Sequence, residues 1–478
     1  MVSGASFKVH LLSLKKYLFF YGISIVIFIL PLTFFHPPSY VYPLFTIMAL
    51  LPFTILLALD VLARLRPGVP RSLPIGPRFL DLTLFFLAIS LYGSIPYFST
   101  HVLSPADALF ESLSATTTTS FTLLERGRTP SFILLWRAYQ SWQGALFYLL
   151  FIVEVLRYYW GPGAETPQRE FPIKFPFIAY RRAPVSFSLL FFMSITAFLF
   201  IAYLPFMRIE DALSLSFAVS STGGVSTYGH TLPDVEGVYF VTSIGLILVS
   251  LNFIELLRAG FRRSVKEPLE GYYYLIFLGL FSLLFAVRSL LSGTQITYGL
   301  FALLSASSGA GIYPHGWPSG IDDFALYLLL LLMAIGGCTF SVTSGLKVKR
   351  VVSILRAIYR ELLRAIHPRA YLGLQGEHWS GERFFLHSTI FIFFLYMGAT
   401  LTGAVLLIIS GLGIRNGIFL ALSALTNTGL DPLTEAIGIN NFTPFQKFCT
   451  MVLMLVGRLE VVIPVFLFSP SLRRFARG

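Results

Sequence analysis

Four short polar stretches recur along the chain, and each follows an apolar run that is too short to cross a bilayer. In register they occupy residues 117–121, 221–225, 308–312 and 426–430, with a hydroxyl residue first and an apolar residue last in every copy. The fourth position holds Ser120, Gly224, Gly311 and Gly429. Irregular backbone survives at membrane depth only where protein buries it or water lines it. Four such segments in one chain therefore predict the four quarters of an ion-conducting pore.

The composition is that of an integral membrane protein. Of the 478 residues, 55% are hydrophobic and 12% are charged, whereas soluble domains carry about 25% charged residues. The net charge of +12 lies in short clusters between apolar runs, which is typical of cytoplasmic loops rather than of a nucleic-acid-binding face. Two cysteines, Cys338 and Cys449, exclude a disulfide framework and offer no metal cluster. No small-residue cleavage site follows the first apolar run, so we expect a retained membrane helix rather than a signal peptide.

Ten stretches have the roughly 20 mostly apolar residues that a membrane helix needs. They are 17–36, 42–63, 78–98, 131–158, 184–207, 238–257, 272–291, 323–346, 385–412 and 444–467. The first two form a leading pair, and each later pair brackets one polar stretch. We therefore predict an all-α membrane protein with ten crossings and four re-entrant segments around one central pore. Its units are a leading transmembrane hairpin (1–77) and four pore repeats (78–183, 184–269, 270–370 and 371–478).

The orientation follows from the basic residues. With the N-terminus inside and ten crossings, most of the 35 lysines and arginines fall in cytoplasmic segments. The positive-inside rule then predicts that both termini are cytoplasmic and that the four polar loops enter from the outside.

The polar loops are suited to binding a dehydrated cation through backbone oxygens. Glycine tolerates positive φ, which lets successive carbonyls turn to one side without a Cβ clash. Each preceding short helix would direct its negative C-terminal end at the pore axis. The expected ion-binding residues are Thr118, Thr119, Ser120, Thr222, Gly223, Gly224, Gly309, Ala310, Gly311, Asn427, Thr428 and Gly429.

These motifs resemble the Trk/Ktr/HKT superfamily of potassium transporters, and most closely its TrkH-type pore subunits. Residues 110–120 are similar to the family's first filter, FES-x-SG-x-TTTG, and residues 222–227 to its second, TGGFST. Residues 135–137 and 140–142 look like the LWR and QW that follow the first filter. The resemblance runs from about Arg78 to the C-terminus. It implies K⁺ uptake across the inner membrane of a prokaryote, a homodimer and no bound cofactor.

A run of small and polar residues interrupts the expected helix at 323–346. Glycine costs about 1 kcal/mol relative to alanine in a helix interior, so a rigid apolar helix is unfavourable here. The run is similar to the family motif GGC-x-GST-x-GG-x-K, where the family places a gating loop beneath the filter. The resemblance implies gating roles for Gly336, Gly337, Cys338, Thr339, Phe340, Ser341, Ser344 and Gly345. A kinked helix without a gating role is the alternative.

Arg458 lies in the middle of the last expected crossing. A charge at that depth costs at least about 2.5–3.5 kcal/mol on insertion scales and is a functional candidate. Its sequence context, GRLE, matches the family, in which this arginine raises the barrier for cations below the filter. Glu460 is expected on nearly the opposite helix face. The alternative is a structural ion pair with Glu154 or Glu255.

Residues 347–369 form a basic cytoplasmic helix in which Arg356, Arg360 and Arg364 make one stripe. Such a stripe is typical of a positive-inside face and is also suited to anionic membrane lipid or an acidic partner. The resemblance implies that the partner is a cytosolic, nucleotide-binding TrkA-like ring.

Two alternatives to a K⁺-selective pore remain at this point. Serine is disfavoured in the left-handed conformation, so the carbonyl of Ser120 is expected to turn away from the axis, which would favour a pore that also admits Na⁺. A membrane enzyme or an organic-solute carrier is the alternative of another class. Intramembrane clusters of His, Cys and Asp are missing from the sequence, and the four units share one orientation rather than forming inverted repeats.

Overall fold

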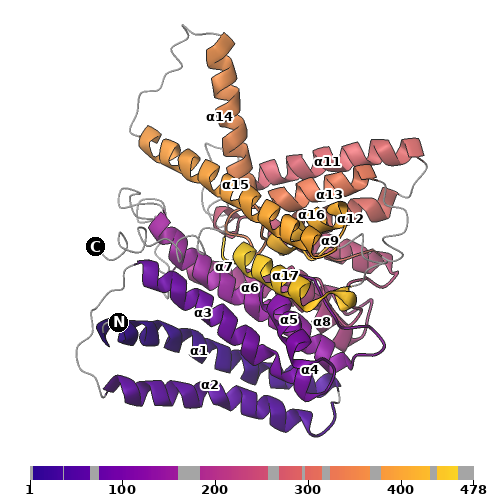
Figure 1. Ribbon diagram of the computed structural model, residues 1–478. Coiled ribbons are helices and arrows are strands. Elements are labelled where there is room, and N and C mark those ends of the chain that lie inside the picture. Colours follow the sequence, from indigo (N-terminus) through magenta and orange to yellow (C-terminus); the bar gives the residue numbers. More distant parts are fainter. Residues whose placement is uncertain are drawn as a thin grey trace.

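The computed structural model describes residues 4–35, 37–64, 75–159, 183–256, 269–292, 296–314, 323–366, 378–430 and 439–460. Within these ranges every regular element is helical (Figure 1), apart from isolated bridges between Ser226 and Gly229 and between Thr231 and Tyr313. The predicted all-α class is confirmed.

A leading helix pair precedes the repeats. Helices α1 (Gly4–Leu32) and α2 (Val41–Arg64) pack against each other at one edge of the molecule, with the 3₁₀ turn η1 (Thr33–Phe35) between them. Helix α1 also packs against the first repeat. The ring of Phe28 lies 5.2 Å from the rings of both Phe45 and Trp136, measured between centroids. Aromatic packing therefore fixes the pair to the first repeat.

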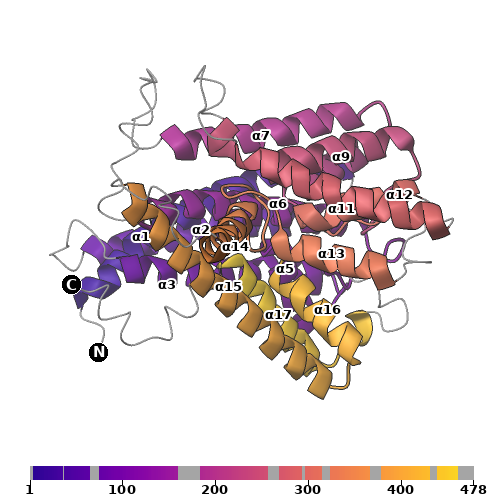
Figure 2. The same cartoon turned by 90° about the horizontal axis from the view of Figure 1, so that it is seen from above.

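Four sets of helices follow, each with a short helix between longer ones. The first set is α3 (Ile75–Gly93), α4 (Ile95–Ser99), α5 (Pro105–Thr116) and α6 (Ser131–Tyr159), and the second is α7 (Ala183–Tyr203), α8 (Ile209–Ser220) and α9 (Glu236–Ser250). The third is α11 (Glu270–Ser292), α12 (Ile296–Ser308) and α13 (Asp323–Ile335), and the fourth is α15 (His378–Ile409), α16 (Ile414–Leu425), the turn η3 (Ile439–Asn441) and α17 (Pro444–Arg458). Figure 2 shows α7 and α9 on one side of the molecule and α15, α16 and α17 on the other.

The short helices α5, α8, α12 and α16 have 12 or 13 residues. At 1.5 Å per residue they reach about 18–20 Å, which is less than the roughly 30 Å of a bilayer core. Local sequence fixes where α5 begins. The Ser104 side chain accepts a hydrogen bond from the backbone N–H of Asp107, and Pro105 occupies the first turn.

The third repeat is interrupted within 323–346, where the sequence has its run of small and polar residues. Helix α13 ends at Ile335, an irregular segment follows, and α14 (Val348–Ile366) then projects away from the other helices (Figures 1 and 2). Gly336 and Gly345 have φ of 68° and 91°, which an α-helix does not accommodate. We call residues 336–347 the intramembrane loop.

The outer faces of the long helices are apolar. Two of them, at Glu270–Leu291 and Leu386–Ile409, are long and apolar enough to cross a membrane, and eight shorter apolar helices accompany them in the described part of the chain. Leu291 is 80% exposed and Ile409 is 76% exposed. Large apolar side chains on outer faces are expected where lipid replaces water.

Candidate functional site

The four polar loops share one backbone geometry at the ends of their short helices. In each copy the N–H before the aligned Ser or Gly position donates to a carbonyl five residues earlier. These bonds run from Thr119 to Ser114 (2.8 Å), Gly223 to Ala218 (2.9 Å), Ala310 to Ser305 (3.0 Å) and Thr428 to Ser423 (3.0 Å). The loops are thus four copies of one turn.

Left-handed residues recur in the same register. Two positions before the aligned column, Thr118, Thr222, Gly309 and Asn427 have φ of 55°, 57°, 73° and 51°. In the column itself, Gly224, Gly311 and Gly429 have φ of 66°, 63° and 69°. A left-handed conformation costs a non-glycine residue roughly 1–2 kcal/mol. Together with the bonds to carbonyls five residues earlier, the left-handed residue closes each short helix in a Schellman-type C-cap.

The loops meet one another through their glycines. A Cβ added at Gly224 would clash with the Ala310 carbonyl oxygen and with the Ser120 side chain. At Gly311 it would meet the Thr428 oxygen and Ser120, and at Gly429 it would meet the Ser120 backbone. The structure therefore brings the aligned positions of all four repeats into contact, although they are far apart in the sequence.

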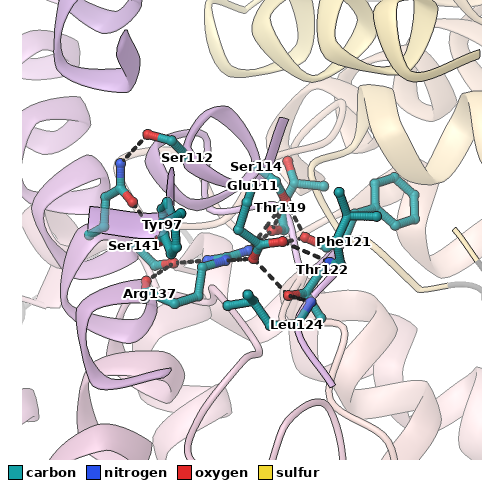
Figure 3. Close-up of polar contacts among 12 residues, drawn as sticks. Tyr97, Glu111, Ser112, Ser114, Thr119, Phe121, Thr122, Leu124, Arg137 and Ser141 are labelled. Carbon is teal, nitrogen blue, oxygen red and sulfur yellow. Dashed lines mark hydrogen bonds and ion pairs between the residues drawn. The ribbon is translucent and has the colours of Figure 1, made fainter. Parts of the chain in front are cut away.

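A buried ion pair supports the first loop from behind (Figure 3). Arg137 Nε donates to Glu111 Oε1 at 2.6 Å, and both side chains are fully buried. The same guanidinium donates through Nη2 to the carbonyl of Thr119 at 2.7 Å. The Glu111 carboxylate also accepts from Thr122 Oγ1 and from the Leu123 N–H, each at 2.7 Å. Paired and hydrogen-bonded in this way, the two charges are compatible with burial.

The intramembrane loop packs on the end of α9. The N–H of Cys338 donates to the Ser250 carbonyl at 2.9 Å. The Glu270 carboxylate accepts from the Thr339 N–H at 2.7 Å and from the Lys349 N–H, at the start of α14, at 3.0 Å. One side chain thus ties this loop to the two helices α11 and α14.

Arg458 lies between the fourth loop and the intramembrane loop. Its side chain is 1% exposed and donates to the Val342 carbonyl at 3.2 Å and to Ser344 Oγ at 3.4 Å. A Cβ at the preceding residue, Gly457, would clash with the Leu425 carbonyl oxygen at the end of α16. The arginine therefore contacts the loop that the sequence predicts as a gate.

Arg458 and Glu460 do not pair with each other, and their side chains have different hydrogen-bond partners. Glu460 pairs with Arg350 at 2.8 Å and accepts from Tyr148 Oη at 3.0 Å. The Arg458 guanidinium instead stacks 4.0 Å from the Tyr148 ring centroid. Glu255, one alternative partner, accepts from the Glu270 N–H, and the Glu154 side chain lies outside the described residues.

Comparisons with known proteins agree with this arrangement. Residues 273–474 match the family model described as TrkH, cation transport protein. The chain is 27% identical over 421 residues to an uncharacterized cation transporter of Methanocaldococcus jannaschii, covering 84% of each chain. It is 26% identical over 434 residues to the Trk system potassium uptake protein TrkH of Halomonas elongata, covering 83% of this chain and 86% of the relative.

A solved structure has the same fold. The crystal structure of the potassium transporter TrkH from Vibrio parahaemolyticus superposes with a TM-score of 0.81 at 24% identity and covers 98% of this chain and 99% of the other. In its sequence over residues 273–474 and in its fold, the chain is similar to TrkH cation transport proteins. Members of this family are ion transporters rather than enzymes.

Two side chains of this protein have contacts that the sequence pattern did not assign. Arg137 was noticed within a motif, but its bond to the Thr119 carbonyl depends on how α6 packs against α5. Glu270 stands at the start of α11, and its contacts with residues 339 and 349 are long-range. In the sequence, Arg137 and Glu270 could have been singled out because each is a charged residue in or beside an expected membrane helix. Such a residue is a functional candidate by default.

Proposed function

We propose that this chain is a member of the TrkH family and takes up K⁺ across the cytoplasmic membrane through the ring of four polar loops. The observation that carries the proposal is the repeated left-handed backbone at Thr118, Thr222, Gly309 and Asn427, in loops that contact one another. Backbone oxygens of the twelve predicted filter residues would replace the hydration shell of the ion. The names of the potassium uptake relatives support the choice of ion.

In this proposal the intramembrane loop and Arg458 control the path below the filter. Residues Gly336, Gly337, Cys338, Thr339, Phe340, Ser341, Ser344 and Gly345 form the gate, and Arg458 adds a fixed positive charge beside it. The burial of Arg458 supports this role, because a buried charge interacts more strongly with a passing ion than an exposed one.

Regulation and assembly belong to the same proposal. Helix α14 offers Arg356 and Arg360, with Arg364 on the same stripe in the sequence, to anionic lipid or to a cytosolic nucleotide-binding TrkA-like ring. We place both termini in the cytoplasm, with ten crossings, a leading hairpin and four pore repeats at the boundaries given above, and expect a homodimer.

One observation favours a second candidate within the same class, a pore that also admits Na⁺. Ser120 is not among the described residues with positive φ, unlike the glycines aligned with it. Its hydroxyl donates to the Ala310 carbonyl at 2.5 Å. The first quarter therefore differs from the other three at the level where ion preference is set.

The test is flux into proteoliposomes, measured for K⁺ and Na⁺ side by side, together with growth at low K⁺ of a host that lacks its own K⁺ uptake. We expect K⁺ flux and rescue of growth. Equal Na⁺ and K⁺ flux would favour the second candidate, and absence of both fluxes in correctly inserted protein would reject both.

A further inference from the structure

The peptide unit between Thr119 and Ser120 is oriented differently from its counterparts in the other loops. In the second and fourth loops the aligned N–H turns back toward its own short helix. Gly224 N lies 3.4 Å from the Ala218 oxygen, and Gly429 N lies 3.4 Å from the Ser423 oxygen.

The neighbouring glycines reveal the same difference. The carbonyl oxygen of Ala310 lies against Gly224, and the carbonyl oxygen of Thr428 lies against Gly311. By symmetry the carbonyl oxygen of Thr119 should lie against Gly429. The backbone nitrogen of Ser120 lies there instead. A carbonyl and an N–H have exchanged places, which is what rotation of one peptide plane produces.

The backbone angles agree with this rotation. Turning over the plane before a residue changes that residue's φ, and Ser120 lacks the positive φ that Gly224, Gly311 and Gly429 share in this described column. The chemical reason lies in the side chain, because a Cβ clashes in the left-handed conformation that glycine tolerates.

Arg137 holds the rotated carbonyl from behind the loop (Figure 3). Thr119 O accepts from Arg137 Nη2 at 2.7 Å. Ser114 Oγ lies within hydrogen-bond distance of the carbonyls of Thr119 (2.7 Å) and Phe121 (2.6 Å), and its single proton serves one of them at a time. The bond to Phe121 corresponds to that of Ser423 in the fourth loop, which donates to the Leu430 carbonyl at 2.7 Å, so Arg137 is the donor specific to the first loop. Arg137 is fixed by Glu111 and also donates to Ser141 Oγ at 2.5 Å. The planar guanidinium therefore donates at the same time to the Glu111 carboxylate and to the Thr119 carbonyl.

We propose that Arg137 is a positioning residue that holds the Thr119 carbonyl away from the conduction path, so that the first loop presents the Ser120 hydroxyl and N–H where the other loops present carbonyls. This inference rests on the proposed function. At the level of the Thr119, Ala310 and Thr428 carbonyls, the filter then has one backbone oxygen fewer. The Ser120 hydroxyl also donates a hydrogen bond to the Ala310 carbonyl, so that this oxygen is already engaged. Fewer free oxygen ligands lower the affinity for a dehydrated cation at this position.

The test compares Ser120→Gly with Ser120→Ala in the full-length protein. Both variants lose the hydroxyl, but only glycine removes the Cβ that disfavours the left-handed backbone. The primary measurement is the K⁺ concentration that gives half-maximal thermal stabilisation of the purified protein, followed by K⁺ flux. We expect Ser120→Gly to lower this concentration by about tenfold, equivalent to one added ligand interaction. Ser120→Ala frees the Ala310 carbonyl but keeps the Cβ, so we expect a clearly smaller shift in this variant.

An equal shift in both variants would assign the effect to the hydroxyl and overturn the rotated peptide, and the absence of a shift in either would do the same. Absence of K⁺ flux through the wild-type protein would instead reject the proposed function. The failure of this inference and the failure of the proposed function are therefore distinguishable.

The role of Arg137 is tested separately with Arg137→Lys. Lysine keeps the charge beside Glu111 but lacks the planar fork that reaches Thr119 at the same time. We expect the half-maximal K⁺ concentration to fall in the same direction as in Ser120→Gly. A lower melting temperature with an unchanged K⁺ dependence would show that Arg137 is merely structural and would overturn its assignment as a positioning residue.

Discussion

The Glu270 carboxylate holds Thr339 by two hydrogen bonds, from its N–H at 2.7 Å and from its hydroxyl at 2.5 Å. Glu270 is 5% exposed and accepts further bonds from Asn252 Nδ2 and from the Lys349 N–H, each at 3.0 Å. Every one of these partners is a donor. The geometry therefore requires an acceptor with two oxygens, and a neutral amide cannot replace it fully.

We expect Glu270→Gln to loosen the intramembrane loop, because the amide N–H₂ would face donors. Cys338 reports this directly, since it is buried in the loop and the chain has one other cysteine, Cys449. In a Cys449→Ser background, Glu270→Gln should raise the rate of Cys338 labelling from the cytoplasmic side and raise cation flux.

Glu125→Gln is the matched control, because Glu125 forms an exposed pair with Arg128 far from the loop in sequence. Such a pair contributes little to stability. Unchanged Cys338 labelling in a folded Glu270→Gln protein would show that Glu270 does not hold the loop.

Gly224→Ala and Gly311→Ala should each abolish most K⁺ flux while leaving membrane insertion intact. Both glycines have positive φ, and an added Cβ would clash with a filter carbonyl and with Ser120. Gly279→Ala is the control, because a Cβ at this position in α11 meets nothing within 4 Å. Normal uptake and selectivity in both filter variants would place these loops outside the conduction path.

Arg458→Ala should raise cation flux. At an effective dielectric constant of about 20, a unit charge roughly 10 Å away contributes about 1.7 kcal/mol to the energy of a passing cation. Removing this charge would speed passage by roughly 15- to 20-fold. Arg458→Lys, which keeps the charge, should remain close to the wild type in proteoliposome flux. Normal flux with poor thermal stability in Arg458→Ala would assign the residue a structural role.

Shortening the intramembrane loop between Gly337 and Ser344 should raise flux and reduce its dependence on any cytosolic partner. The loop contacts both Ser250 and Arg458, so its removal opens space between α9 and α17. Flux with and without the partner is the measurement. Loss of membrane insertion alone would instead identify the segment as structural.

The sequence by itself determined the helical class, because apolar runs of membrane length and polar loops at a repeated register are local patterns. It also predicted that helix 323–346 would be interrupted, since Gly336 and Gly345 lie in its second half. Where a glycine occupies the aligned column, as at Gly224, the residue type shows that positive φ is tolerated there.

Only the tertiary structure decided which loops touch and which charges meet. Arg137 reaches the Thr119 carbonyl because α6 packs against α5, and Glu270 reaches Lys349 across 79 residues of sequence. Such contacts depend on helix packing and not on local propensity. Ser120 could be recognised in the sequence as the exception among the four loops. The guanidinium of Arg137 that bonds the preceding carbonyl was visible only in the folded protein, because it depends on how α6 packs against α5.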